Sequence, residues 1–283
     1  MPTGTRPSPV AKLPQELVEL IISYLIYDTY TLLACSLTCY SWYIAAVPHL
    51  HHSLTTDQDS YMLSGMKYYW PAPLRESYML GLLPFVKRFR IRREMIFSEL
   101  RPSNLDGGTL RYFSALTNLQ ELGIDCLEVS EFMPKIQKCF GHLSPTLRSL
   151  ALKEPHGSCR QISYFIGLFP NLQDLKLHYD LPPFDFIEKK IIVDDPTLIP
   201  LSTPPLRGRL TLICFTKEDL VKEMIGFFGG LRFRHMDLFG VSCAKLLLDT
   251  CAETLETLRL YPTDLHGEEV PNEKRRNAYG SYL

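Results

Sequence analysis

Arginine occupies every second position in the stretch KRFRIRR, residues 87–93, where Arg88, Arg90 and Arg92 alternate with apolar residues. Side chains two residues apart in a strand point to the same side, so the three guanidinium groups would share one face. Guanidinium groups bind carboxylate and phosphate in bidentate fashion, which makes an acidic or phosphorylated segment of a partner the fitting ligand. The alternative, which we favour, is a solvated strand face or a chance basic cluster. Nucleic acid ranks third because the basic stretch is short and the formal net charge is −1.

Sequence motifs that carry catalysis are absent: the chain has no G-x-S-x-G, H-E-x-x-H, Walker A or G-x-G-x-x-G pattern. His49, His51 and His52 cluster within four residues, but no cysteine pair or carboxylate accompanies them at a metal-ligand spacing. Satisfied or exposed histidines are therefore the favoured interpretation. We expect a protein that is not an enzyme, with no catalytic residues, no cofactor and no metal.

Composition indicates a globular chain, with 46% hydrophobic and 22% charged residues over 283 positions. The eight cysteines show no C-x-x-C spacing, there is no N-x-S/T site, and the first residues lack an apolar signal region. These features predict an intracellular protein, cytoplasmic and/or nuclear, with reduced thiols. No run reaches 18 uninterrupted apolar residues, so we expect no membrane span.

The N-terminal elements are predicted to be short apolar helices. The stretch LPQELVELIISYL, residues 13–25, predicts a helix that begins near Pro14, because proline fits a first helical turn. A second helix follows the polar residues 28–31, and we expect Pro48 to break a third. Residues 13–54 contain no lysine or arginine. Three short helices cannot bury so much apolar surface among themselves, so we expect either a partner protein or the rest of the chain to cover it.

These residues resemble an F-box, the three-helix module that docks onto a Skp-type adaptor. The matching residues are Leu13, Pro14, Glu16, Leu17, Ile21, Ile22, Tyr24, Leu25, Asp28, Leu32, Leu33, Ser36, Leu37, Cys39, Trp42, Pro48 and Leu50. One departure is that Tyr40 and Ser41 stand where family members often carry arginine or lysine after the cysteine. The resemblance implies adaptor contacts, with some side chains facing the module's own interior, at Leu13, Pro14, Leu17, Ile21, Ile22, Leu25, Leu32, Leu37, Cys39 and Trp42.

The rest of the chain repeats the pattern L-x-x-L-x-L seven times, with final positions 91, 124, 152, 177, 212, 238 and 260. This pattern resembles that of leucine-rich repeats. Helices are expected between the strands at 129–143, 159–169, 217–230 and 242–251. The predicted fold class is α/β: an F-box-like module followed by a leucine-rich-repeat-like solenoid with a parallel sheet on its concave face. An ordinary α/β sandwich is the alternative.

The concave face is the predicted surface for target recognition, because residues between the apolar positions point outward. The candidate target-binding residues are Arg88, Arg90, Arg92, Asp174, Lys176, His178, Arg209, His235 and Arg259. The last strand, ending at Leu260, is followed by a charged, turn-rich sequence with no obvious cap. We therefore expect its apolar edge to stay bare.

The predicted organisation has five parts: a disordered tail at 1–11, the F-box-like module at 12–55, a joint at 56–84, the repeat region at 85–262 with a loop insertion at about 179–206, and a C-terminal tail at 263–283. The whole resembles F-box proteins with leucine-rich repeats, the substrate receptors of SCF-type cullin-RING ubiquitin ligases. The resemblance implies a Skp-type adaptor, and through it a cullin-RING assembly, as one partner and a protein target as the other. A repeat scaffold without a ubiquitin role is the alternative.

Overall fold

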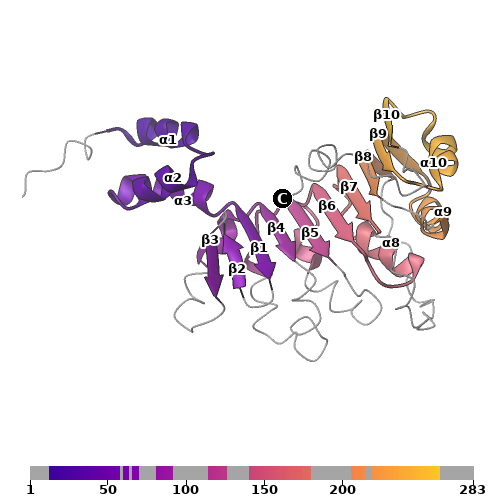
Figure 1. Cartoon of the computed structure of the whole chain (residues 1–283), viewed down its shortest axis with the longest axis horizontal. Coiled ribbons are helices and arrows are strands. Elements are labelled where there is room, and N and C mark those ends of the chain that lie inside the picture. Colours follow the sequence, from indigo (N-terminus) through magenta and orange to yellow (C-terminus); the bar gives the residue numbers. More distant parts are fainter. Residues whose placement is uncertain are drawn as a thin grey trace, which may run out of the picture.

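The computed structural model describes residues 13–57, 60–63, 66–69, 81–91, 114–125, 140–179, 205–213 and 218–261. Three helices come first: α1 (Gln15–Tyr24), α2 (Thr29–Ser36) and α3 (Tyr40–Leu50). A ten-stranded sheet follows, and Figure 1 shows the helices at one end of this row of strands. The N-terminal helical module and the sheet are therefore separate parts of one elongated molecule.

The helical module has its own small core. Pro14 precedes α1, and the Asp28 carboxylate caps α2 by accepting a hydrogen bond from the Thr31 backbone N–H at 3.0 Å. The three helices bury one shared cluster of side chains: Val18, Ile22, Leu32, Ala45, Ala46 and Leu50. All six are small or aliphatic, so the helices approach closely while much of their outer surface remains uncovered.

Pro48 does not break the third helix, which corrects the sequence-based prediction. Helix α3 continues through Pro48 to Leu50, and the His51 N–H still bonds to the Val47 carbonyl at 3.0 Å. Proline lacks only its own N–H, which in a regular helix would bond to the carbonyl of Ile44. Because Pro48 lies in the last turn, the helix loses one hydrogen bond and is otherwise intact.

Eight strands of the sheet are parallel: β1 (Ser53–Asp57), β4 (Arg88–Ile91), β5 (Glu121–Asp125), β6 (Ser149–Lys153), β7 (Asp174–His178), β8 (Leu206–Ile213), β9 (Leu231–Phe239) and β10 (Thr257–Tyr261). From β4 to β10 each strand pairs with the next one along the chain. Two antiparallel strands, β2 (Ser60–Leu63) and β3 (Met66–Tyr69), extend the sheet beyond β1. Figure 1 shows the strands fanning along this row.

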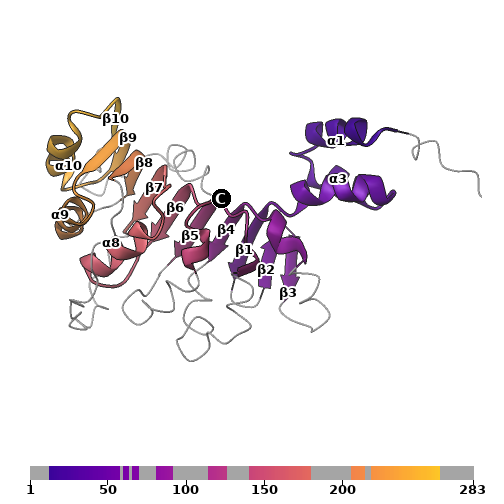
Figure 2. The ribbon, with the colours of Figure 1, turned by 180° about the vertical axis from the view of Figure 1, so that it is seen from behind.

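Each of the seven L-x-x-L-x-L stretches supplies one strand, from β4 to β10. In β4 to β9 the apolar positions point into the core; in β6, for example, Leu147, Leu150 and Leu152 are at most 1% exposed. In the last strand, β10, Leu260 is 56% exposed. Helices α8 (Cys159–Gly167), α9 (Glu218–Phe227) and α10 (Ala244–Cys251) lie along one side of the sheet (Figure 2) and lie within the three helical ranges expected there. Of the range 129–143, residues 129–139 lie outside the described part, and Gly141–Leu143 forms the short 3-10 turn η3. The other side of the sheet carries the alternating, less buried residues.

The starts of β4, β5, β6 and β7 use the same hydrogen bonds. The carbonyl of Lys87 accepts the N–H groups of Gln120 and Glu121 at 2.8 and 2.9 Å, and that of Arg148 accepts those of Gln173 and Asp174 at 2.7 and 3.0 Å. The carbonyl of His52 accepts those of Lys87 and Arg88 in the same way, at 2.8 and 3.0 Å. The strand next to the helical module is thus built like the others.

Strand β1 is an element that the sequence did not predict, since residues 53–55 were assigned to the F-box-like module and residues 56 and 57 to the joint. In the register, Leu54 of β1 aligns with Phe89 of β4. Three residues before Phe89 lies the buried Val86, and His51 occupies the same position three residues before Leu54. The buried Leu119 occupies this position ahead of β5. His51 is only 5% exposed. Because histidine stands where the L-x-x-L-x-L pattern has an apolar residue, the pattern did not indicate a strand here. Because α3 ends at Leu50 and β1 starts at Ser53, two residues join the module to the sheet.

Candidate functional site

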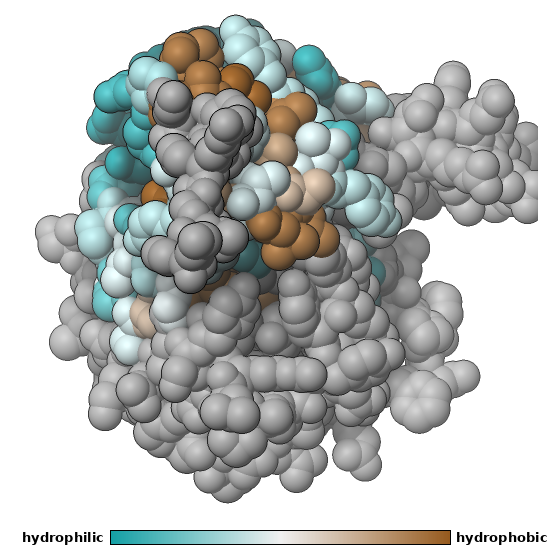
Figure 3. All heavy atoms as spheres, turned by 90° about the vertical axis from the view of Figure 1, so that its left-hand side faces the viewer, coloured by the Kyte–Doolittle hydropathy of each residue, from teal (hydrophilic) through white to brown (hydrophobic). Residues whose placement is uncertain are grey.

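Exposed apolar side chains concentrate on the helical module. Of the fourteen large hydrophobic side chains that are exposed among the described residues, eleven belong to it: Leu13, Leu17, Leu20, Ile21, Tyr24, Tyr27, Tyr30, Leu37, Tyr40, Tyr43 and Ile44. Figure 3 faces this end of the molecule and shows brown, hydrophobic residues open to solvent on it. Many large exposed apolar side chains gathered on one small module are typical of a protein-binding face. We call these eleven residues the apolar module surface.

The structure sorts the ten predicted adaptor-contacting residues into three groups. Leu13, Pro14, Leu17, Ile21, Leu37 and Cys39 are exposed, and Leu25 and Trp42 are half-buried. Ile22 and Leu32 are 0% and 1% exposed, so they form the module's core and not its surface. Neighbouring residues such as Ile21 and Ile22 point in different directions on a helix, which is why spacing alone did not separate them.

Tyrosines on the apolar module surface were not among the predicted contacts. Tyr24, Tyr27, Tyr30 and Tyr40 are 80%, 95%, 88% and 77% exposed. Tyrosine joins a large apolar ring to a hydroxyl group, and this combination is enriched at protein interfaces. The signal that points to them is their recurrence in residues 24–40, where no charged residue except Asp28 interrupts them.

The family comparison addresses this same part of the chain. The sequence model of the F-box-like family matches residues 10–57. Those residues form an F-box-like domain, as the resemblance in the sequence indicated. The match ends at the last residue of β1, so the F-box-like domain includes the strand that joins it to the sheet. No curated protein matches the chain.

A second surface lies on the side of the sheet away from the helices. The register aligns outward residues into rows across the strands, and the first row is Ser53, Arg88, Glu121, Ser149, Asp174, Arg209, His235 and Thr257. The second row is Thr55, Arg90, Gly123, Ala151, Lys176, Thr211, Asp237 and Arg259, and the third is Asp125, Lys153, His178, Ile213, Phe239 and Tyr261. We call these rows the outward sheet face.

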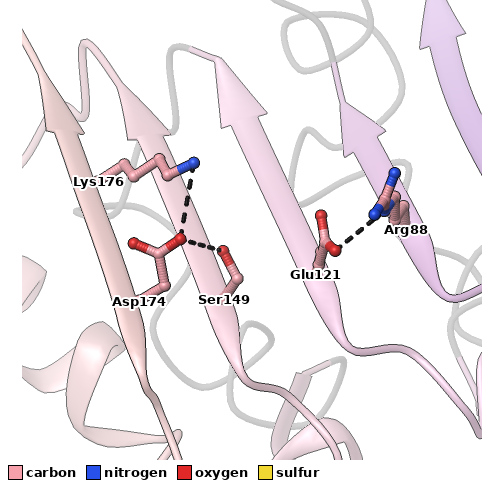
Figure 4. Close-up of polar contacts among 5 residues, drawn as sticks. All are labelled: Arg88, Glu121, Ser149, Asp174 and Lys176. Carbon is pink, nitrogen blue, oxygen red and sulfur yellow. Dashed lines mark hydrogen bonds and ion pairs between the residues drawn. The ribbon is translucent and has the colours of Figure 1, made fainter. Parts of the chain in front are cut away.

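Eight of the nine predicted target-binding residues lie on the outward sheet face, while Arg92 lies outside the described residues. The arginines of β4 are not free, however. Arg88 forms an ion pair with Glu121 at 2.9 Å, shown in Figure 4, and Arg90 reaches Asp125 at 3.3 Å. The side chain of Arg90 passes over Gly123, where an added Cβ would lie 3.3 Å from the Arg90 Cγ. The neighbouring strand therefore neutralises both arginines.

Two further ion pairs lie on the later strands of the outward sheet face. The Asp174 carboxylate contacts the Lys176 ammonium at 3.6 Å and accepts a hydrogen bond from the Ser149 hydroxyl at 3.4 Å (Figure 4). Arg259 lies 3.9 Å from Asp237. Such exposed pairs contribute little to stability. They do fix the directions of long side chains and so shape the face that a partner would meet.

A cavity of about 670 Å³ lies where the F-box-like domain meets the first described residues after β3. It is lined by Glu19 from α1, by Tyr43 to Ala45 and Val47 to His49 from α3, and by Gly81, Leu82 and Phe85. Burial lowers the pKa of His49, and the nearby His52 and Lys87 lower it further. Burial and neighbouring basic groups thus both disfavour the charged form of His49, and Glu19 is the only acidic residue that lines the cavity among the described residues.

The histidine cluster forms no metal site in the described part of the chain. There, no group of three or more His, Cys, Asp or Glu side chains could hold a metal ion. Burial lowers the pKa of His51 to about 4, and the His51 Nδ1 atom has no hydrogen-bond partner. His52 Nδ1 instead contacts the His49 carbonyl at 2.6 Å. These histidines are structural parts of the junction between α3 and β1.

Two buried cysteines lie in the C-terminal units. Burial raises the pKa of Cys243 to about 11 and that of Cys251 above its usual value. Thiols that stay protonated at neutral pH are poor nucleophiles.

Among the described helices, none is long and apolar enough to cross a membrane.

Proposed function

We propose that this chain is a non-catalytic substrate receptor of an SCF-type ubiquitin ligase. The observation that carries the proposal is the F-box-like domain at residues 10–57 together with the exposed apolar surface on it. A Skp-type adaptor would cover the apolar module surface and connect the chain to a cullin-RING assembly. The large exposed aromatic and aliphatic side chains would be the anchors of that interface.

The sheet would serve as the target-binding part. Seven strands in chain order, each carrying L-x-x-L-x-L, support reading this region as leucine-rich-repeat-like, with its outward sheet face open to a partner. The function would be to bring two molecules together. Holding a target near a ubiquitin-carrying enzyme raises the effective concentration of its lysines, and this requires no catalytic group in the chain.

Co-purification with a purified Skp-type adaptor tests the adaptor half of this proposal. We expect the wild-type chain to bind at micromolar concentration. The double variant Leu17→Lys and Leu37→Lys should weaken binding about tenfold or more, because it places charges in an apolar interface. Both side chains are exposed, at 46% and 80%, so the fold should be unaffected.

The matched control is Leu260→Lys, which changes a side chain that is 56% exposed but lies on β10. This variant should bind the adaptor like the wild type. Circular dichroism melting of all three proteins verifies that they are folded. A folded wild-type chain that does not bind the adaptor at micromolar concentration would reject the receptor role and leave a repeat scaffold as the function.

A further inference from the structure

Strands β8 and β9 place basic side chains side by side. Arg207 and Arg209 lie on β8, and the register pairs them with Arg232 and His235 of β9. The three arginines are exposed, and His235 is half-buried. Adjacent strands are about 4.8 Å apart, and residues two apart along one strand are at most about 7 Å apart. Four basic residues therefore share a small area, which we call the β8–β9 basic cluster.

This cluster differs from the other arginines of the sheet. Arg88, Arg90, Arg234 and Arg259 each have a carboxylate within 4.0 Å, namely Glu121, Asp125, Glu256 and Asp237 respectively. Within the described part of the chain, Arg207, Arg209 and Arg232 have none. Asp174, the register partner of Arg209 on β7, is engaged by Lys176 and Ser149 instead.

The backbone holds the cluster in place. The register between β8 and β9 shifts between Gly208 and Arg209, so that Arg234 is an extra residue on β9. Gly208 has φ +92, and a Cβ there would lie 2.1 Å from the carbonyl oxygen of Gln173. Arg234 therefore has no register partner on β8, and its side chain forms an ion pair with Glu256 at 3.6 Å. The remaining basic side chains stay together, although like charges directly opposite on neighbouring strands destabilise a sheet.

We propose that the β8–β9 basic cluster binds an acidic segment of the target protein, an extended stretch carrying aspartate or glutamate side chains. Arginine forks pair with carboxylates in bidentate fashion. Carboxylates on alternate residues of an extended chain are about 7 Å apart, which fits the spacing along β8. This inference rests on the proposed function, because it names the chemistry of the target that the sheet would hold.

Nucleic acid fits this surface less well. The chain as a whole carries a formal net charge of −1, and the acidic side chains Asp174, Asp237 and Glu256 surround the cluster. A polyanion with a charge on every residue would meet these carboxylates as well as the arginines. A short acidic segment places its charges only where the arginines are.

Fluorescence anisotropy with labelled synthetic peptides tests the inference on the full chain. One peptide alternates glutamate and alanine, a second replaces glutamate by glutamine, a third replaces it by phosphoserine, and a single-stranded oligonucleotide is the fourth probe. We expect the glutamate peptide to bind about tenfold or more tightly than the glutamine peptide at ~0.1 M salt. The variant Arg207→Gln and Arg232→Gln should weaken the glutamate peptide about tenfold.

The matched control is the variant Arg88→Gln and Arg234→Gln, which removes two arginines that already have carboxylate partners. It should change the affinity less than about threefold. The inference is overturned if both variants weaken binding equally, or if the glutamate and glutamine peptides bind alike. It is also overturned if the phosphoserine peptide or the oligonucleotide binds while the glutamate peptide does not.

Two further readouts complete the test. The single variant Arg232→Gln should keep or raise the melting temperature, because it removes a like-charge contact; a lowered melting temperature would contradict the arrangement. Adaptor co-purification of the Arg207→Gln and Arg232→Gln variant should equal that of the wild type. A wild-type chain that binds the adaptor but not the glutamate peptide would reject this inference alone. A wild-type chain that binds the glutamate peptide but not the adaptor would reject the proposed function alone.

Discussion

Gly208 shows how a single residue sets the geometry of a surface. Its φ of +92 lies in the region that favours glycine, and the Gln173 carbonyl occupies the space of any Cβ. That carbonyl is also the acceptor for the Arg209 N–H at 2.8 Å. A side chain at position 208 would therefore disturb both the strand start and the bulge beside it.

We predict that Gly208→Ala lowers the free energy of unfolding by about 2–4 kcal/mol, because the φ is strained for alanine and the neighbouring carbonyl must move. The control is Gly226→Ala in α9, where no atom lies within 4 Å of the added Cβ. That change should stabilise by about 0.4–1 kcal/mol. Urea denaturation of both variants checks the prediction, and equal effects would contradict it.

For the arginines of β4, the sequence predicted the face on which they lie but not their ion-pair partners. Alternation placed Arg88 and Arg90 on the outward face, and the structure agrees. Their partners Glu121 and Asp125 are 33 and 35 residues away in the chain, and only the register brings them together. Of the β8–β9 basic cluster, Arg209 and His235 were predicted, while Arg207 and Arg232 were not. The cluster as a unit was not predicted, since Arg207 and Arg232 are neighbours only across strands.

At the scale of elements, helix α8 contains a matched pair of serines. Ser158 caps the helix: its hydroxyl accepts from the Gln161 N–H at 3.2 Å, and the Gln161 side chain accepts from the Ser158 N–H at 2.9 Å. Ser163 is fully buried in the same helix, and its hydroxyl has no partner. The two hydroxyl groups should therefore affect stability differently.

We predict that Ser158→Ala costs about 1 kcal/mol of stability, because the first turn of α8 loses a cap. Ser163→Ala should be neutral or stabilising, because it removes a buried polar group that makes no hydrogen bond. Thermal unfolding of both variants measures the difference. A larger loss for Ser163→Ala than for Ser158→Ala would contradict the assignment of the cap.

Elements with regular spacing were predictable, and irregular ones were not. The strand at Leu150 and Leu152 follows directly from its alternation, and the helix ending near Gly167 from its apolar spacing. Strand β1 escaped because His51 occupies a core position where the template expects leucine. A propensity rule also placed a helix end at Pro48, although the last turn tolerates it.

At the scale of the molecule, the two cores meet at the junction of α3 and β1. Val47 and Leu54 belong to the core of the sheet, while Ala46 and Leu50 belong to that of the F-box-like domain. His51 lies between them and is neutral when folded, because burial lowers its pKa to about 4 from 6.5. Protonation of this residue would therefore weaken the contact between the two parts.

The sign of the pH dependence follows from that shift. Between pH 6.5 and about 4 the unfolded chain binds a proton at His51 that the folded chain does not, so stability falls as pH falls through this range. The loss from this residue between pH 7 and pH 5 is about 2 kcal/mol. We predict that His51→Leu reduces the pH dependence by that amount and raises stability at pH 7 by about 1–2 kcal/mol.

Urea denaturation of wild type and His51→Leu at pH 7 and pH 5 measures both effects. The control is His52→Leu, which replaces the neighbouring, half-buried histidine by the same residue. A pH dependence that persists unchanged in His51→Leu would show that other groups cause it.

The short connection through His51 and His52 also limits rotation. With its carbonyl bonded to the N–H groups of Lys87 and Arg88, His52 cannot swivel without breaking both bonds. A protein bound to the helices and another bound to the sheet would therefore keep a constant orientation relative to each other. Each strand added or removed between them would lengthen or shorten that span by about 4.8 Å. The distance between the two bound proteins would thus change only in steps of one strand spacing.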